Sequence, residues 1–293
     1  MTDNDNKLDK SRKLRSILWA IAMLMLTTVG IGVMTAVALV VFGQSYWTLM
    51  IMQGASSIGI FLLSAFIAVY ISERKICGSD SDWHFDIVTA ICCIVLVLLC
   101  QPLVEWASYV NEWICKQPYM EWAKVFDIDQ TDIMATLMSF EPVSHYIMCI
   151  VVIAILPAIC EEFFFRGVIL RGLTATMHSV SGAVVVSAIF FSMLHLDIEG
   201  FLPRVVLGII LGFLYLKTRS LLYPIIAHAT NNAMVVIVTA SSDESVKDIL
   251  SKEAENPGPA MPILSLAVTL WICWMISQRY QNAKAEEKSD NQD

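Results

Sequence analysis

Charged residues are scarce in this sequence: Asp, Glu, Lys and Arg make up 16% of its 293 residues, while 57% are hydrophobic. In a typical soluble domain, about a quarter of the residues are charged. The shortage of charge therefore excludes an ordinary soluble protein. The net charge of −8, with basic residues confined to the flanks of apolar segments, also gives no reason to expect nucleic-acid binding.

Cysteine pairs at metal-ligand spacing are absent, although the chain has 8 cysteines. None are spaced as CxxC, and most fall within or beside apolar segments, so we interpret them as small packing residues. The sequence also lacks an internal repeat. A transporter that uses Glu and His for proton coupling is therefore the weakest functional alternative, because many transporter folds are built from repeats.

Long apolar segments are abundant instead. Eight have almost no charge: Ile17 to Phe42, Trp47 to Ile71, Ile87 to Val104, Tyr146 to Cys160, Val180 to Leu194, Val205 to Leu216, Leu221 to Ala240 and Met261 to Ile276. Several approach the roughly 20 residues that a helix needs to cross the hydrocarbon core. The sequence therefore predicts an all-α, polytopic integral membrane protein, with about eight transmembrane helices around an intramembrane polar cavity.

Basic residues collect at alternate ends of these segments: before the first, and after the second, fourth, sixth and eighth. Loops rich in Lys and Arg stay on the cytoplasmic side, so we predict that both termini are cytoplasmic. The expected organisation is a basic segment at 1–16, a membrane domain at 17–277 and a charged tail at 278–293. We expect disorder from about Gln281, because the tail has little apolar surface to bury.

The longest connection between apolar segments runs from Glu105 to Ser144. Large apolar residues recur at helical spacing in its first part: Trp106, Tyr109, Val110 and Trp113. This spacing predicts a helix that lies along the membrane interface, where aromatic residues anchor a chain. A similar pattern at 133–138 predicts a second such helix. A substrate gate is the alternative interpretation of this connection.

Ionisable residues inside apolar segments are few, and such residues usually face the interior of a helix bundle or a wet cavity. Glu161 and Glu162 end the fourth segment. In a helix, Glu162 stands four residues from Arg166 and can pair with it, whereas Glu161 points about 100° away. We predict a Glu162–Arg166 ion pair and an unpaired Glu161, beside Phe164 and Phe165, that can exchange a proton. The alternative is two interfacial charges that mark the end of a span.

Two further polar sites lie on other segments. The fifth segment ends with Phe191 and His195 on one helical face, and the seventh places His228 and Asn232 four residues apart. A histidine and an amide so placed can donate hydrogen bonds to one developing oxyanion. The alternatives are a packing histidine in the fifth segment and an interhelical polar clamp in the seventh, where small alanines let helices approach.

Together these residues form three ordered motifs. Glu161 to Arg166 matches EExxxR, Phe191 to His195 matches FxxxH, and His228 to Asn232 matches HxxxN. The combination resembles the CPBP (Abi) family of intramembrane proteases, which includes the Rce1-like CAAX prenyl proteases and bacterial relatives of the bacteriocin-immunity type. The resemblance covers residues from about 145 to 240. It implies an integral membrane protein of the bacterial cell membrane.

The resemblance also implies a role for each matching residue. Glu161 and His195 would activate a water to attack a peptide carbonyl, and His228 and Asn232 would stabilise the oxyanion. Glu162, Arg166 and Phe191 would support the site. The implied partners are the lipid bilayer and a membrane-associated or lipid-modified peptide substrate. A non-catalytic immunity or partner-binding protein that retains the fold is the alternative function.

The family's members have also been described as metalloproteases, so a cofactor question follows from the resemblance. Glu161, His195 and His228 are the candidate ligands of a divalent metal such as zinc. Because Glu and His can activate water without a metal, the metal-free mechanism is the favoured expectation.

The predicted topology places Glu161 and His195 on opposite sides of the membrane, which is incompatible with a shared site. With cytoplasmic termini, Glu161 would end its span near the cytoplasmic face, and His195 would end the next span near the outer face. The two side chains could share a water only if His195 lay at cavity depth. The segments Val180 to Leu194 and Val205 to Leu216 are both short, so we expect a tilted or shallow hairpin there.

Overall fold

The computed structural model describes residues 3–72, 85–126, 136–137, 143–240 and 258–290, and within these ranges every regular element is helical. Seven helices are long and apolar enough to cross a membrane. An eighth, shorter apolar helix, α10, spans Val180–Met193. Each of the eight predicted segments thus corresponds to a helix, and the prediction of an all-α polytopic membrane protein is confirmed.

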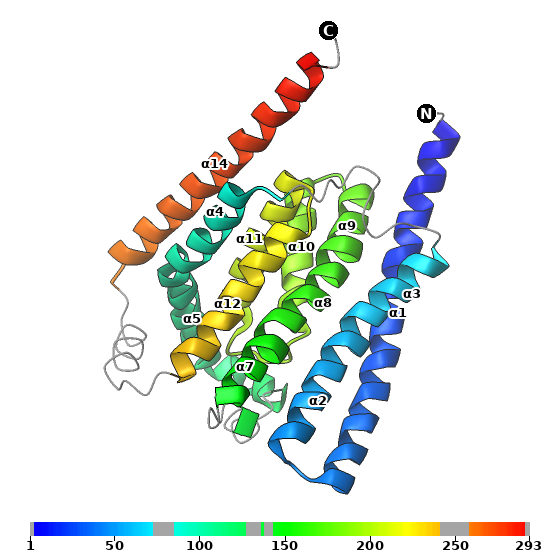
Figure 1. Ribbon diagram of the computed structural model, residues 1–293, viewed down its shortest axis with the longest axis vertical. Helices are drawn as coiled ribbons and strands as arrows, with labels where there is room; N and C mark the ends of the chain where they lie inside the picture. Colours follow the sequence, from blue (N-terminus) through cyan, green and yellow to red (C-terminus); the bar gives the residue numbers. More distant parts are fainter. Residues whose placement is uncertain (1–2, 73–84, 127–135, 138–142, 241–257, 291–293) are drawn as a thin grey trace.

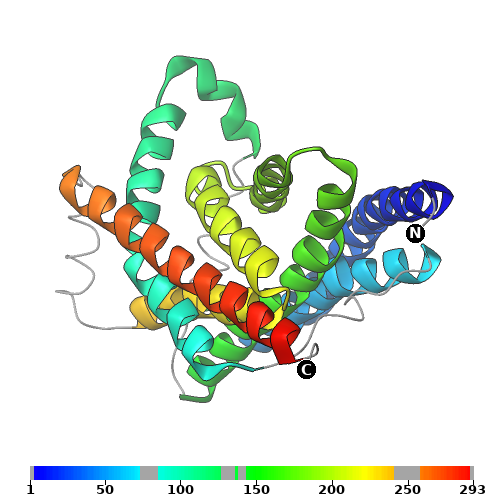
Figure 2. The same cartoon turned by 90° about the horizontal axis from the view of Figure 1, so that it is seen from above.

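The first hairpin consists of α1 (Asp3–Phe42) and a second helix formed by α2 (Tyr46–Ser56), a π-helical segment (Ser57–Leu63) and α3 (Ser64–Ile71). The chain resumes with α4 (Ile87–Leu99), α5 (Gln101–Cys115) and a 3₁₀ segment (Pro118–Phe126). These two groups lie on opposite flanks of the bundle (Figures 1 and 2).

The centre of the bundle holds the helices that carry the three motifs (Figure 1). One continuous helix is built from α7 (Val143–Cys149), a π-helical segment (Ile150–Ile155), α8 (Leu156–Phe164), a second π-helical segment (Phe165–Leu170) and α9 (Arg171–Thr176). It is followed by α10, α11 (Phe201–Thr218) and α12 (Leu222–Ala240). The last helix is α14 (Ala260–Asp290), which packs against α4, α5 and α11.

The predicted end of the fourth span is wrong. The helix does not finish at Cys160 but continues as a 34-residue apolar stretch, Val143–Thr176, so Glu161 and Glu162 lie in its middle. The charges interrupted the apolar pattern in the sequence. They do not interrupt the helix, because Glu162 pairs with Arg166 one turn later inside the bundle.

Both ends of the chain are helical over most of their length, which corrects the expected disorder of the tail. Helix α1 begins at Asp3, so the basic segment 1–16 is largely helical and continuous with the first span. Helix α14 runs to Asp290, so the tail expected to be disordered from Gln281 is helical through most of its length. The tail is rich in Ala, Lys and Glu, which form helices by local propensity without needing a buried face. The starting end of α1 and the final end of α14 lie at the same end of the bundle (Figure 1).

The third span is longer than the sequence indicated. The helix predicted around Trp106 to Trp113 is α5, but it follows α4 directly, and together they form an apolar stretch from Ile87 to Cys115. The break at Cys100 coincides with Pro102 in the first turn of α5, where a proline is tolerated. The second helix expected at 133–138 falls almost entirely outside the described residues, which there include only 136–137.

Helices α10 and α11 approach closely because α11 has glycines at 208 and 212. A Cβ atom at Gly208 would lie 2.9 Å from Ala188 Cβ, and one at Gly212 would lie 3.1 Å from Val184 Cγ1. This small-residue spacing is typical of tight contacts between membrane helices. The close approach brings the backbone of α11 next to the polar residues of the central helix.

Candidate active site

Glu161 and His195 lie at the same depth, which removes the difficulty in the predicted topology. Glu161 is 15 residues before the end of the central helix at Thr176, and His195 is 15 residues after the start of α10 at Val180. Adjacent helices joined by a short connection run in opposite directions, and 15 residues rise about 22 Å in each. Because α10 is short, His195 stops near the middle of the central helix. Of the two segments expected to form a tilted or shallow hairpin, α10 is short, whereas α11, with 18 residues, is long enough to span.

Glu162 is the centre of a buried hydrogen-bonded cluster. Its Oε1 accepts a hydrogen bond from Arg166 Nη1 at 2.7 Å and lies 2.9 Å from His228 Nδ1. The side chains of Glu162, Arg166 and His228 are only 0–3% exposed. Arg166 Nη2 also donates to the carbonyl oxygen of Gly208, at 3.1 Å. The predicted Glu162–Arg166 pair is confirmed, and the link from Glu162 to His228 was not anticipated.

Glu161 points toward both histidines. Its Oε2 atom lies 4.0 Å from His195 Nε2 and 3.8 Å from His228 Nε2, and its side chain is only 10% exposed. This oxygen is buried and has no hydrogen-bond partner among the described residues. A buried carboxylate oxygen without a partner is costly unless a group outside the chain satisfies it. The two adjacent glutamates therefore differ. Glu162 is held by Arg166 and His228, whereas Glu161 has an oxygen that can bind a group from outside the chain.

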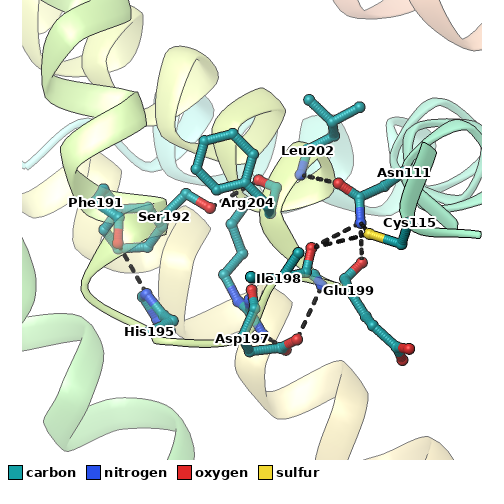
Figure 3. Close-up of polar contacts among 12 residues, drawn as sticks. Asn111, Cys115, Phe191, Ser192, His195, Asp197, Ile198, Glu199, Leu202 and Arg204 are labelled. Atoms are coloured by element: carbon teal, nitrogen blue, oxygen red, sulfur yellow. Dashed lines mark hydrogen bonds and ion pairs between the residues drawn. The ribbon is translucent and has the colours of Figure 1, made fainter. Parts of the chain in front are cut away.

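The hydrogen bonds of both imidazoles leave Nε2 directed at Glu161. His195 Nδ1 lies 2.9 Å from the carbonyl oxygen of Phe191 (Figure 3), and a carbonyl can only accept, so the proton resides on Nδ1. The Phe191 carbonyl is in the last turn of α10, where backbone acceptors lack intrahelical partners. His228 Nδ1 likewise faces the carboxylate of Glu162. In the neutral form, each ring then presents its Nε2 lone pair to the site.

Phe191 lines the site with its ring. The ring makes edge-on contacts with His195 and His228, at centroid distances of 4.9 and 5.6 Å. The Arg166 guanidinium carbon lies 5.2 Å from the same ring centroid. A fully buried guanidinium gains from an aromatic face in a place that water cannot reach. Phe191 therefore packs between the charged pair and the two histidines.

Asn232 does not join this group directly. It lies one turn after His228 on α12, and its Oδ1 accepts a hydrogen bond from Asn231 Nδ2 at 3.4 Å. Asn231 in turn accepts a hydrogen bond from Gln101 of α5, also at 3.4 Å. The structure thus brings Glu161, His195 and His228 together and leaves Asn232 at the edge of the site.

Sequence reasoning missed two contributors. Gly208 supplies a carbonyl to Arg166, and the GxxxG spacing of Gly208 and Gly212 was the available signal for a close helix contact. Asn111 of α5 contacts the loop that follows His195, through hydrogen bonds to Ile198 and Glu199. No pattern in the sequence singled out this asparagine.

The candidate metal ligands Glu161, His195 and His228 lie near one another but not at the spacing of a metal site. Two Nε2 atoms and a carboxylate oxygen are donor types that zinc accepts, but donors about 2.1 Å from one zinc ion lie roughly 3.4 Å apart in a tetrahedral site. The distances here are 4.0 and 3.8 Å. Among the described residues, no group of three His, Cys, Asp or Glu side chains is arranged to hold an ion. The site as it lies does not fit a bound metal, so we derive no step through one.

Comparison with known proteins agrees with the motifs. Residues 143–234 match the family of the type II CAAX prenyl endopeptidase Rce1-like proteins. Over 107 residues the chain is 30% identical to a Bacillus subtilis (strain 168) protein named "Putative membrane peptidase YdiL", a stretch that covers 36% of this chain and 42% of that protein. The chain therefore spans less than half the length of this relative. No solved structure matches.

The matched range contains every residue of the buried cluster, from Glu161 to His228, together with the helices that hold it. Over residues 143–234 this chain is thus similar to the type II CAAX prenyl endopeptidase Rce1-like family, and a relative of part of the chain carries the name of a putative membrane peptidase.

Proposed function

We propose that this protein is an intramembrane endopeptidase that hydrolyses a peptide bond of a membrane-associated or lipid-modified substrate. The observation that carries the proposal is the position of Glu161 Oε2, which faces His195 Nε2 and His228 Nε2 in a buried part of the helix bundle. The similarity of residues 143–234 to this family supports a peptidase, and the name of the family makes a prenylated C-terminal peptide the first substrate class to try.

The spacing suits activation of water by Glu161 and His195. A distance of 4.0 Å between Oε2 and Nε2 is too long for a direct hydrogen bond, and one water about 2.8 Å from each atom would bridge them. Glu161 accepts a proton as the water oxygen bonds to the peptide carbonyl carbon. The carbonyl oxygen then becomes an oxyanion. When the C–N bond breaks, the same proton passes to the departing amine, so the residues return to their starting state.

His228 and Asn232 are the proposed oxyanion donors. His228 can donate from Nε2 only when it carries a proton on both ring nitrogens, because Nδ1–H is directed at Glu162. The buried set of Glu161, Glu162 and Arg166 has two acids and one base. If His228 carries a second proton, the two negative carboxylates and the two positive groups, Arg166 and His228, have a total charge of zero. Asn232, one turn further along α12, would donate from its amide nitrogen if the substrate carbonyl reached the edge of the site.

The proposed orientation places both termini in the cytoplasm of a bacterium, with the protein in the plasma membrane. The common end of α1 and α14 in Figure 1 supports termini on one side. The basic residues that flank the first and last spans support the cytoplasmic side.

The test uses the full-length protein in lipid vesicles with two fluorescence-quenched peptides, one bearing a farnesylated C-terminal cysteine motif and one identical but unprenylated. We expect cleavage by wild type and a loss of at least about 10³-fold in Glu161→Gln, which removes the proton acceptor, and in His195→Ala, which removes the Nε2 atom that helps to hold the water. Glu199→Gln is the matched control, since Glu199 is an exposed acid near His195 and outside the cluster.

Wild-type turnover that survives in Glu161→Gln and His195→Ala would overturn the protease proposal and favour a non-catalytic immunity or partner-binding protein. The same cleavage assay after exhaustive chelation tests whether the activity requires a metal ion. Activity that persists after chelation excludes a zinc mechanism, and activity restored only by added zinc would replace the mechanism above.

A further inference from the structure

We infer that Asn111 is a positioning residue for His195. It connects α5 to the loop of residues 194–200, here called the His195 loop, and holds His195 at the depth of Glu161. The inference rests on the proposed function, because it assigns His195 a reacting role.

Asn111 directs its amide at this loop and the first turn of α11, besides a longer contact from Nδ2 to Cys115 Sγ at 3.6 Å. Its Nδ2 donates to the carbonyl oxygens of Ile198 at 2.8 Å and Glu199 at 2.7 Å, and its Oδ1 accepts from Leu202 N–H at 3.1 Å (Figure 3). The residue is 3% exposed. A buried amide inside an apolar stretch is costly unless its bonds are made, and here three backbone groups satisfy it.

Apart from a long contact from Cys115 Sγ of α5 to the Ile198 carbonyl oxygen, at 4.0 Å, the other contacts that hold the His195 loop come from the helices on either side of it. Ser192 Oγ donates to the carbonyl oxygen of Phe201 at 2.7 Å, which closes the loop across its ends. Arg204 forms an ion pair with Asp197 and also donates to the Asp197 carbonyl oxygen at 3.1 Å. These contacts join α10 to α11. Asn111 adds a connection to α5, a helix more than 80 residues earlier in the chain.

The backbone of the loop is strained next to His195. Leu196 has φ of +50°, a left-handed conformation that a leucine rarely adopts. Such residues keep their conformation only where surrounding contacts fix them. With the Asn111 hydrogen bonds removed, we expect the loop to relax at Leu196. His195 would then leave its position 4.0 Å from Glu161 Oε2.

Asn111→Asp tests this with almost no change of shape. The variant keeps an oxygen for Leu202 N–H and replaces the amide donor with an acceptor that faces two carbonyl oxygens. With the farnesylated peptide as probe, we expect kcat to fall by about 10²-fold, the cost of displacing a reacting group by roughly 1 Å, while KM changes little. Backbone hydrogen exchange in residues 194–202 should rise in the same variant.

Gln117→Glu is the matched control, because Gln117 makes the same kind of hydrogen bond, from Nε2 to the Trp113 carbonyl oxygen at 3.0 Å, at an exposed position. It should change neither readout. A second variant, Asn111→Ser, keeps a donor and an acceptor on a shorter side chain, and we expect partial recovery of kcat relative to Asn111→Asp.

The possible failures are distinguishable. If wild type cleaves the probe and folded Asn111→Asp matches its kcat, or if exchange in 194–202 is unchanged, the positioning role is wrong and the protease proposal stands. A rise in KM at constant kcat would also overturn it, since that result places Asn111 in substrate binding. If wild type cleaves neither peptide, the protease proposal fails first.

Discussion

Two arginine–carboxylate pairs in this protein lie in opposite surroundings. Arg279 of α14 donates from Nε and Nη2 to the two oxygens of Asp86, at 2.7 and 3.0 Å, with the two side chains 51% and 29% exposed. Arg166 contacts Glu162 through Nη1 alone, at 2.7 Å, with both side chains 0–1% exposed. The exposed pair thus has the better geometry.

The buried Glu162–Arg166 pair does not have the geometry expected of an ion pair that mainly stabilises the fold. Glu162 Oε2 and Arg166 Nε are buried without hydrogen-bond partners among the described residues. Removing two charges from water costs more than such a geometry returns. The same Glu162 oxygen, however, also fixes His228. The comparison indicates that the pair near Asp86 ties α14 to the start of α4, whereas the pair at Glu162 orients a histidine in the site.

The largest expected effect on stability follows from breaking the buried pair on one side. Arg166→Met leaves the Glu162 carboxylate buried without its cation, so we expect a loss of about 3–5 kcal/mol in the free energy of unfolding. Unfolding in mixed detergent micelles, followed by circular dichroism, measures it. The double variant Glu162→Leu with Arg166→Met removes both charges and should recover most of the loss. A double variant as unstable as Arg166→Met would show that the pair does stabilise the fold.

An intermediate effect concerns activity. Glu162→Gln keeps the size of the side chain and removes the charge that favours Nδ1–H on His228. We expect kcat for the farnesylated peptide to fall by about 10²-fold, less than in Glu161→Gln, because Glu162 acts through His228 and does not meet the water. Equal losses in the two variants would place both acids in the chemical step and contradict the separation of their roles.

The smallest effect is expected at the exposed pair. Asp86→Asn keeps a capping side chain for the N–H groups of Val88 and Thr89 at the start of α4 and removes the charge. We expect a loss of less than about 1 kcal/mol in the free energy of unfolding, as for other exposed pairs. Asp86→Ala, which removes the cap as well, should lose more.

The pH dependence of the exposed pair has a defined sign. The hydrogen bond from Arg279 is the main cause that lowers the pKa of Asp86 to about 2 from its ordinary 3.8. A lowered acid pKa stabilises the folded state above the ordinary value, and the stabilisation is lost as pH falls toward the folded one. The difference in Tm between wild type and Asp86→Asn should therefore shrink below pH of about 3.8. A constant difference would contradict the ion pair.

Sequence reasoning succeeded where one local rule dominates. Apolar length predicted the eight helices, and the four-residue spacing predicted the Glu162–Arg166 pair. It failed where the adjacent charges of Glu161 and Glu162 resembled the end of a span, because their burial in mid-helix depends on helices that pack around them from distant parts of the chain. The disorder expected after Gln281 was wrong for the opposite reason, since local helix propensity alone suffices there.

The sequence by itself determined that this is a polytopic membrane protein and which few polar residues its spans contain, because hydrocarbon tolerates only apolar helices and buried, compensated charges. Only the tertiary structure decided that Glu162 also contacts His228, that Glu161 faces two imidazoles, and that Asn111 reaches the loop after His195. The approach of His195 to Glu161 depends on the depth at which short α10 ends beside the long central helix. That depth is set by packing between helices, and no single helix encodes it.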